Sequence, residues 1–340
     1  MLVLRMARLT SVLLTTFLAC RLLGAPGIQD SAPSPSLQQQ LGQIDALVQQ
    51  NQLEESLNRL QTLRRQHPNN AAILARLGTI YFQKQDYFKA LAPLRDVLRL
   101  EPDHKQATQY LGSSLYSLGK LQEATPYLEK ALAWFPDNVN FLNILGLCYV
   151  QTGEPDKARL IFSRIFDIPA DSPQAHFVAG VMLRQQDIWG HAEKELRRSL
   201  QLNPDMPMAH LYLGEILFSQ RRMKEALAEF QEEITRNPGM WMAYYRSGEV
   251  LFETGQSDEA IPYLQRAVWL NKFFAGPYLL MGRIHLRARR FDLALDNLQR
   301  AAALDYTNAN AHYLLGRALS RAGRKDEAEK EFSLSKQFRR

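Results

Sequence analysis

Hydrophobic residues along most of this chain recur at helical spacing, in short runs of about a dozen residues. In the segment 105–138, Leu111 and Leu115 lie on one face of such a run, and Gly119 then interrupts it. A second apolar run follows and ends before Pro136. Two helices joined by so short a turn must be antiparallel neighbours. The pattern therefore predicts a helical hairpin for this segment.

The same hairpin pattern returns every 34 residues without an insertion or a gap. One glycine marks each unit: Gly78, Gly112, Gly146, Gly180, Gly214, Gly248, Gly282 and Gly316. Twelve residues after each glycine comes an alanine: Ala90, Ala124, Ala158, Ala192, Ala226, Ala260, Ala294 and Ala328. Small residues at both places allow the two helices to approach closely. One hairpin cannot bury its apolar face alone, so stacked hairpins are expected to share a continuous core.

This ladder resembles the tetratricopeptide repeat family. The residues that carry the resemblance in one unit are Leu142, Leu145, Gly146, Tyr149, Ala158 and Phe162. The resemblance implies an all-α fold, a right-handed α-solenoid of antiparallel helix pairs. The expected tandem repeats are 71–104, 105–138, 139–172, 173–206, 207–240, 241–274, 275–308 and 309–340, which together fill 71–340. A degenerate repeat at 37–70 keeps the second-helix pattern but lacks the glycine and the alanine.

The first residues have the pattern of a targeting segment. Arg5 and Arg8 precede an apolar stretch that is shorter than the roughly 20 residues needed to span a bilayer. We therefore expect residues 1–25 to be a signal peptide and 26–36 to be a Pro/Ser-rich linker. Cleavage near Ala25, lipid attachment at Cys20 and an uncleaved membrane anchor remain open alternatives. The expected location is the periplasm or cell envelope of a bacterium, with secretion as an alternative.

Composition narrows the function classes further. The chain carries 41 Lys and Arg against 35 Asp and Glu, a net charge of +6. Removal of residues 1–25 would take away three arginines and no acidic residue, leaving +3. Two cysteines, Cys20 and Cys148, exclude a disulfide framework and a multi-cysteine zinc site. No phosphate-binding glycine loop, His-Glu-x-x-His or Gly-x-Ser-x-Gly motif occurs. We therefore expect no catalytic residue, no metal and no cofactor, and thus no enzyme.

The resemblance implies that the first helix of each repeat lines a concave groove, which binds a peptide or helix of a partner. Aromatic and arginine residues, which favour binding hot spots, are frequent at the corresponding positions. The predicted groove residues are Phe82, Tyr116, Asn143, Phe177, Arg184, Glu215, Phe218, Tyr245, Glu249, Phe252, Arg283, Tyr313 and Arg317. The alternative interpretation is that several of these aromatic rings fill gaps between adjacent repeats.

Charge changes along the predicted groove. Glu215, Glu249 and Glu253 predict an acidic middle. The arginines that predict a basic C-terminal end are Arg283, Arg287, Arg317 and Arg321. Such a gradient would orient a partner by charge complementarity, and ordinary solvated surface charge is the alternative.

The expected function is that of a non-enzymatic scaffold for protein–protein interaction. A second hypothesis is an accessory subunit that recruits substrates to a separate envelope enzyme. RNA binding by a helical-repeat array is the third, and export and the small net charge disfavour it, so no nucleic acid is expected. Contact with a membrane is expected only through the signal anchor or a lipid on Cys20. The sequence predicts neither the partner nor the oligomeric state.

Overall fold

The computed structural model describes residues 35–339, and these residues form 18 α-helices without a strand. The predicted signal peptide, most of the predicted linker and Cys20 lie outside the described residues. The predicted all-α fold class is confirmed. No helix within 35–339 combines the length and the apolar character required to span a bilayer.

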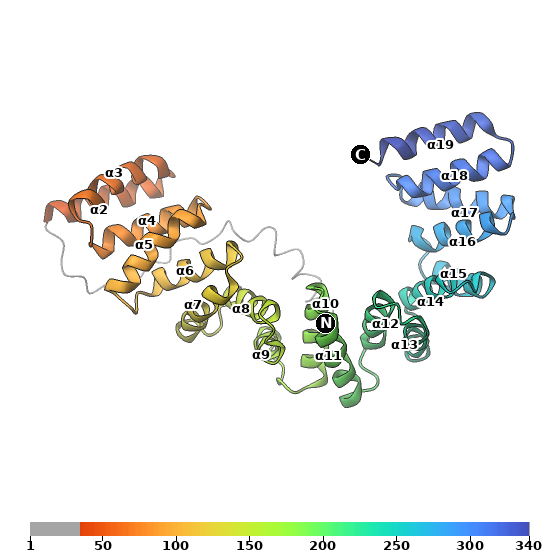
Figure 1. The fold of residues 1–340 in the computed structure, drawn as a ribbon, viewed down its shortest axis with the longest axis horizontal. Helices are drawn as coiled ribbons and strands as arrows, with labels where there is room; N and C mark the ends of the chain where they lie inside the picture. Colours follow the sequence, from red (N-terminus) through yellow and green to blue (C-terminus); the bar gives the residue numbers. More distant parts are fainter. Residues whose placement is uncertain (1–34, 340) are drawn as a thin grey trace. The chain divides into compact units, whose positions relative to one another are not determined.

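The helices fall into two units that divide between Ala170 and Asp171 (Figure 1). The helices of the first unit are α2 (Pro35–Gln49), α3 (Leu53–Gln66), α4 (Ala71–Gln83), α5 (Tyr87–Leu100), α6 (Lys105–Ser117), α7 (Leu121–Trp134), α8 (Val139–Gln151) and α9 (Pro155–Phe166). These helices pack as four successive hairpins: α2 with α3, α4 with α5, α6 with α7, and α8 with α9. Leu41, Ile44, Leu60 and Ile73 belong to a core that joins α2, α3 and α4.

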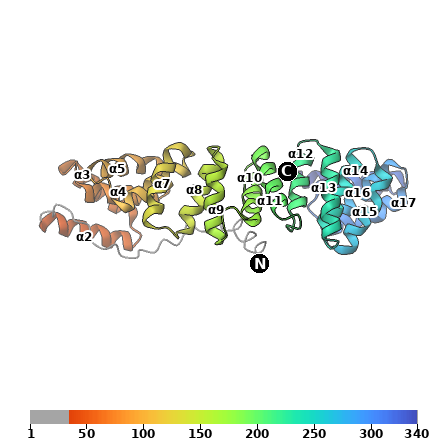
Figure 2. The same ribbon diagram turned by 90° about the horizontal axis from the view of Figure 1, so that it is seen from below.

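The second unit is also built of consecutive helical hairpins, and Figure 2 shows α10 to α13 from another side. Its helices are α10 (Pro173–Gln185), α11 (Trp189–Leu202), α12 (Ala209–Ser219), α13 (Met223–Arg236), α14 (Trp241–Glu253), α15 (Ser257–Leu270), α16 (Ala275–Arg287), α17 (Phe291–Leu304), α18 (Ala309–Arg321) and α19 (Lys325–Gln337). One hydrophobic cluster extends from Leu251 to Ala328, so neighbouring hairpins share a core.

The glycine–alanine ladder lies where the two helices of a hairpin cross. A Cβ added to Gly214 would lie 2.5 Å from the Phe230 ring, and one added to Gly282 would lie 2.5 Å from Leu298. All eight ladder alanines are at most 2% exposed. The Leu or Phe that comes sixteen residues after each glycine therefore packs directly on its backbone. The close approach depends on the absence of a side chain at that position.

The turn inside each hairpin uses one left-handed residue at the same place in every repeat. Glycine supplies this conformation at Gly119, Gly153, Gly255 and Gly323. Other hairpins have a non-glycine residue there, as in Arg221 with φ 62° and Arg289 with φ 57°. The following amide closes the turn, since the N–H of Arg222 donates to the carbonyl of Leu217. A left-handed residue at this point reverses the chain between the two helices.

The first helices of the repeats lie against one another. In the second unit α10 contacts α12, α12 contacts α14, α14 contacts α16 and α16 contacts α18. Between successive second helices such contacts are weaker or absent in the described part of the chain. First helices therefore form the inner side of each unit. We call this surface the first-helix face, made by α4, α6 and α8 in one unit and by α10, α12, α14, α16 and α18 in the other.

Candidate functional site

In the first unit, the predicted groove residues lie on α4, α6 and α8. The Phe82 ring stacks on Tyr110 of the next first helix, with centroids 4.6 Å apart. Phe82 therefore fills space between neighbouring repeats. Tyr116 and Asn143 are half-buried, and burial raises the pKa of Tyr116. This part of the face carries little free charge or exposed aromatic surface.

In the second unit, two predicted aromatic residues are buried rather than exposed. Phe177 is 1% exposed and packs near Tyr212, and Phe252 is 4% exposed. Their rings are not available for direct contact with a partner, in contrast to the predicted groove. Phe218 and Tyr245 are half-buried, whereas Tyr313 is 39% exposed. Tyr313 on α18 is therefore the most exposed of the predicted groove aromatics.

A continuous polar network joins α10, α12 and α14 on the first-helix face. Arg184 Nη1 lies 3.1 Å from Glu215 Oε2, and Arg246 Nη2 lies 2.9 Å from Glu215 Oε1. Arg246 also donates to Glu249 at 2.7 Å, and the Tyr245 hydroxyl donates to the same carboxylate at 2.6 Å. Two arginines thus balance two glutamates in this network.

The network shifts the pKa of its members. Burial raises the pKa of Tyr245, and the adjacent Glu249 carboxylate raises it further. Burial alone would lower the pKa of Arg246, but Glu249 and Glu215 more than offset this and raise it. Both effects favour a protonated Tyr245 and a charged Arg246.

The predicted acidic middle of the groove is therefore not a free acidic surface. Glu215 and Glu249 are committed to Arg184 and Arg246, and Glu253 lies 3.9 Å from Arg221. The prediction counted the charges at the groove positions alone. It missed Arg246, which lies three residues before Glu249 and so on the same side of α14.

At the predicted basic end, arginines lie near aromatic rings and not near carboxylates of the described residues. The Arg283 and Arg287 guanidinium groups lie 4.7 and 4.4 Å from the centroid of the Phe252 ring. Arg317 lies 5.9 Å from the Tyr313 ring. Within residues 35–339, the structure shows no ion pair for these three arginines. Free positive charge on the first-helix face thus gathers on α16 and α18.

Three histidines form pairs with glutamates across their own hairpins. The Nδ1–Oε2 distances are 2.5 Å for His176 with Glu195, 2.6 Å for His210 with Glu229 and 2.6 Å for His312 with Glu331. In each pair the glutamate comes 19 residues after the histidine. The repeat at 139–172 has Leu142 and Ile161 at the same two places. The sequence alone could have indicated these histidine–glutamate pairs, because histidine and glutamate replace the apolar pair together.

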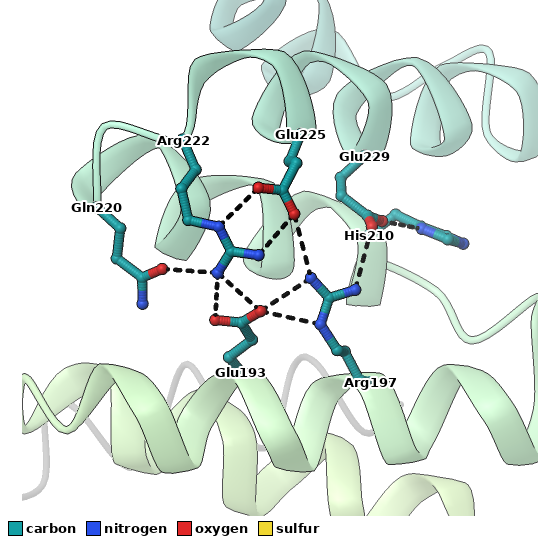
Figure 3. Close-up of polar contacts among 7 residues, drawn as sticks. All are labelled: Glu193, Arg197, His210, Gln220, Arg222, Glu225 and Glu229. Atoms are coloured by element: carbon teal, nitrogen blue, oxygen red, sulfur yellow. Dashed lines mark hydrogen bonds and ion pairs between the residues drawn. The ribbon is translucent and has the colours of Figure 1, made fainter.

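A second polar network lies between α11 and α13, on the second helices (Figure 3). Arg222 Nη1 lies 2.8 Å from Glu193 Oε2, and Arg222 Nη2 lies 2.6 Å from Glu225 Oε2. Arg197 joins Glu193 at 2.8 Å and lies 3.9 Å from Glu229, the partner of His210. Burial would raise the pKa of Glu193, but Arg197 and Arg222 lower it overall. These contacts connect adjacent hairpins and are not part of the first-helix face.

The described residues contain no group of three or more His, Cys, Asp or Glu side chains arranged to hold a metal ion. Cys148 is a free thiol with 0% exposure. Burial raises the pKa of Cys148 to about 11, although a hydrogen bond with Thr125 partly opposes this. A buried and protonated thiol is a poor nucleophile.

Several solved structures are similar to this chain in fold. PilF of Pseudomonas aeruginosa has a TM-score of 0.48 and 22% identity, covering 57% of this chain and 88% of its own. MamA from Desulfovibrio magneticus RS-1 has a TM-score of 0.46 and 21% identity, covering 50% and 96%. YrrB, described as a TPR protein with an unusual peptide-binding site, has a TM-score of 0.44 and 21% identity, covering 49% and 87%.

Curated relatives match over shorter stretches. Protein CTR9 homolog of Arabidopsis thaliana is 28% identical over 31% of this chain, and human protein O-mannosyl-transferase TMTC1 is 24% identical over 40%. Anaphase-promoting complex subunit 3 of Schizosaccharomyces pombe is 22% identical over 46%. The matches span only 10%, 16% and 24% of the lengths of these three relatives.

Family models described as tetratricopeptide repeat match most of the chain. One matches residues 115–179. Another matches residues 41–105, 183–240, 226–278 and 279–337. These matches agree with the helical hairpins and with the resemblance carried by the glycine–alanine ladder. The chain belongs to the tetratricopeptide repeat family.

Proposed function

We propose that this protein is a non-enzymatic scaffold that binds a segment of a partner protein on its first-helix face. The observation that carries the proposal is that arginines without an ion-pair partner among residues 35–339 gather on α16 and α18, beside the exposed Tyr313. Arginine and tyrosine, like tryptophan, are enriched in binding hot spots. Stacked helical repeats present the extended surface that such a segment requires.

The proposal predicts that a photo-reactive residue at position 313 forms a covalent adduct with a partner in the native cells. Tyr313 lies on α18, on the first-helix face, and is 39% exposed. Replacement of Tyr313 by a photo-crosslinking phenylalanine derivative would place the reactive group where we expect the partner. The yield and the site of the adduct would be measured by mass spectrometry.

Leu293 provides the matched control for this experiment. It lies on α17, a second helix of the same unit, and is 50% exposed. The same reactive residue at position 293 should give little or no adduct. Equal adducts at positions 313 and 293, or adducts at neither, would refute the proposed role of the first-helix face.

We further propose that the protein acts outside the cytoplasm, in a cell envelope or as a secreted protein. The support is the sequence pattern of residues 1–25, with arginines before a short apolar stretch. Mass spectrometry of the protein purified from its native cells should find a chain that starts at a lipid-modified Cys20 or near Pro26. A soluble chain that still starts at Met1 would contradict export.

A further inference from the structure

We propose that four arginines on α16 and α18 form a binding site for an acidic segment of the partner protein. This inference rests on the proposed function and specifies the chemistry of its ligand. Arg283 and Arg287 lie on α16, and Arg317 and Arg321 lie on α18. Residues four apart share one side of a helix, and α18 contacts α16. We call these four side chains the arginine patch.

The arginine patch has no internal counter-charge. None of its four members forms an ion pair with a carboxylate among residues 35–339. Other arginines of the same unit are paired, such as Arg184 and Arg246 with Glu215, and Arg222 with Glu193. The patch is therefore the part of the first-helix face where positive charge remains available to a ligand.

Four carboxylates of α14 and α19 pair with residues outside the patch. Glu249, on the adjacent helix α14, accepts hydrogen bonds from Tyr245 and Arg246. On α19, which packs against α18, Glu331 pairs with His312 and Glu327 pairs with Arg324. Glu249, Glu331 and Glu327 thus have other partners, and Glu253 of α14 lies 3.9 Å from Arg221.

Phe252 holds part of the patch in place. The centres of the Arg283 and Arg287 guanidinium groups lie 4.7 and 4.4 Å from its ring centroid, and the ring itself is 4% exposed. A guanidinium group over an aromatic face is stabilised and restricted, while its N–H groups can still donate to a carboxylate. Such pre-organisation lowers the entropy lost when a ligand is bound.

Packing of the repeat does not require these arginines. The equivalent residues are Ser113 and Ser117 on α6, and Leu147 and Gln151 on α8. Two like charges four residues apart on a helix repel each other. Because the fold tolerates uncharged residues at these places, we infer that the arginine pairs serve recognition.

The extent of the patch favours a short acidic protein segment over a nucleic acid. Affinity for a phosphate backbone grows with the number of phosphates that cations neutralise, so a longer track of cations favours nucleic acid. Here the four cations lie on two adjacent first helices, and the next first helix, α14, has Glu249 and Glu253 at the equivalent positions of Arg283 and Arg287. A few carboxylates on one short segment match the four guanidinium groups of the patch.

The test compares the affinity of the full chain for two short fluorescein-labelled peptides by fluorescence anisotropy. One peptide is rich in glutamate, and the other has glutamine in place of each glutamate. We expect preference for the glutamate peptide and a loss of at least about ten-fold in affinity for R283Q/R287Q. R65Q/R198Q removes the same charge from exposed positions on the second helices α3 and α11, and should change affinity less than about two-fold.

A second variant keeps the test decisive if R283Q/R287Q melts at a lower temperature. R317Q/R321Q removes the other half of the patch and leaves the contacts of Phe252 intact, and it should weaken binding in the same way. Equal losses in the patch variants and in R65Q/R198Q would show unspecific attraction and overturn the inference. Equal affinity for both peptides, or tighter binding of a single-stranded oligouridylate, would also overturn it.

The two proposals can fail separately. A partner adduct from position 313 that is unaffected by R283Q/R287Q would support the first-helix face as the binding surface. It would refute the proposal that the ligand is acidic. Absence of any adduct from position 313, or the same yield from position 293, would refute the proposed function itself.

Discussion

Replacement of Glu195 by alanine should destabilise the α10–α11 hairpin by about 3 kcal/mol, because it leaves a buried polar partner behind. The Nδ1 atom of His176 lies 2.5 Å from the Glu195 carboxylate, and both side chains are less than 10% exposed. A buried histidine that loses its hydrogen-bond partner is still desolvated, and no hydrogen bond then offsets the free energy of desolvation. Urea unfolding followed by circular dichroism would measure the free energy, and hydrogen exchange would report α10 and α11 separately.

The chain itself offers the control for this change. The 139–172 repeat has Leu142 and Ile161 at the two equivalent positions, and both are buried. The double variant H176L/E195I should therefore be within about 1 kcal/mol of the wild type, or more stable. A Glu195→Ala variant that unfolds like the wild type would contradict the contribution of the pair to stability. So would a double variant that is as unstable as Glu195→Ala alone.

Replacement of Ala226 by leucine should destabilise the α12–α13 hairpin by about 1–3 kcal/mol through overpacking. Ala226 is fully buried, and the Phe230 ring one turn further along α13 already lies against the backbone of Gly214. A leucine in this crossing has no room unless the helices move apart. The free energy of unfolding in urea measures the effect.

Ala228 is the matched control for this substitution. It lies on the same helix, but its side chain is exposed. Ala228→Leu makes the same chemical change outside the crossing and should alter the stability by less than about 0.5 kcal/mol. Equal effects at the two positions would contradict the close packing of the hairpin.

The sequence was sufficient to predict the fold because the fold depends on a repeated local rule. Each glycine comes sixteen residues before a Leu or Phe that packs on it, as Gly146 does before Phe162. A small residue at one fixed spacing leaves few alternatives for how two short helices pack. The hairpin pattern, the all-α class and the family were therefore accessible without a structure.

The character of the first-helix face was harder to predict because it depends on contacts between repeats. Phe177 and Phe252 occupy predicted groove positions, but neighbouring side chains cover their rings. Glu215 was predicted to be an acidic groove residue, yet arginines from two other first helices reach it. A periodic pattern assigns a residue to a face, but it does not specify which long side chains meet there.

The paired replacement of Leu142 and Ile161 by histidine and glutamate shows that further signals were present. A comparison of the repeats with each other would have revealed that the two positions change together. Such a comparison detects contacts within a hairpin, because every repeat is an independent example of the same geometry. Between first helices the pattern is sparser: Arg76 with Asp45 repeats the spacing of Arg246 with Glu215, whereas Arg184 with Glu215 has no counterpart in another repeat.

The most direct test of this account is the yield of the adduct from position 313 in the native cells, measured with the arginine patch intact and altered. We expect R283Q/R287Q to reduce the yield at least about ten-fold, and R65Q/R198Q to leave it nearly unchanged. The crosslinked partner segment should contain several Asp or Glu residues. An unchanged yield in R283Q/R287Q, or a partner segment without acidic residues, would contradict the claim that the arginine patch on the first-helix face recognises the partner.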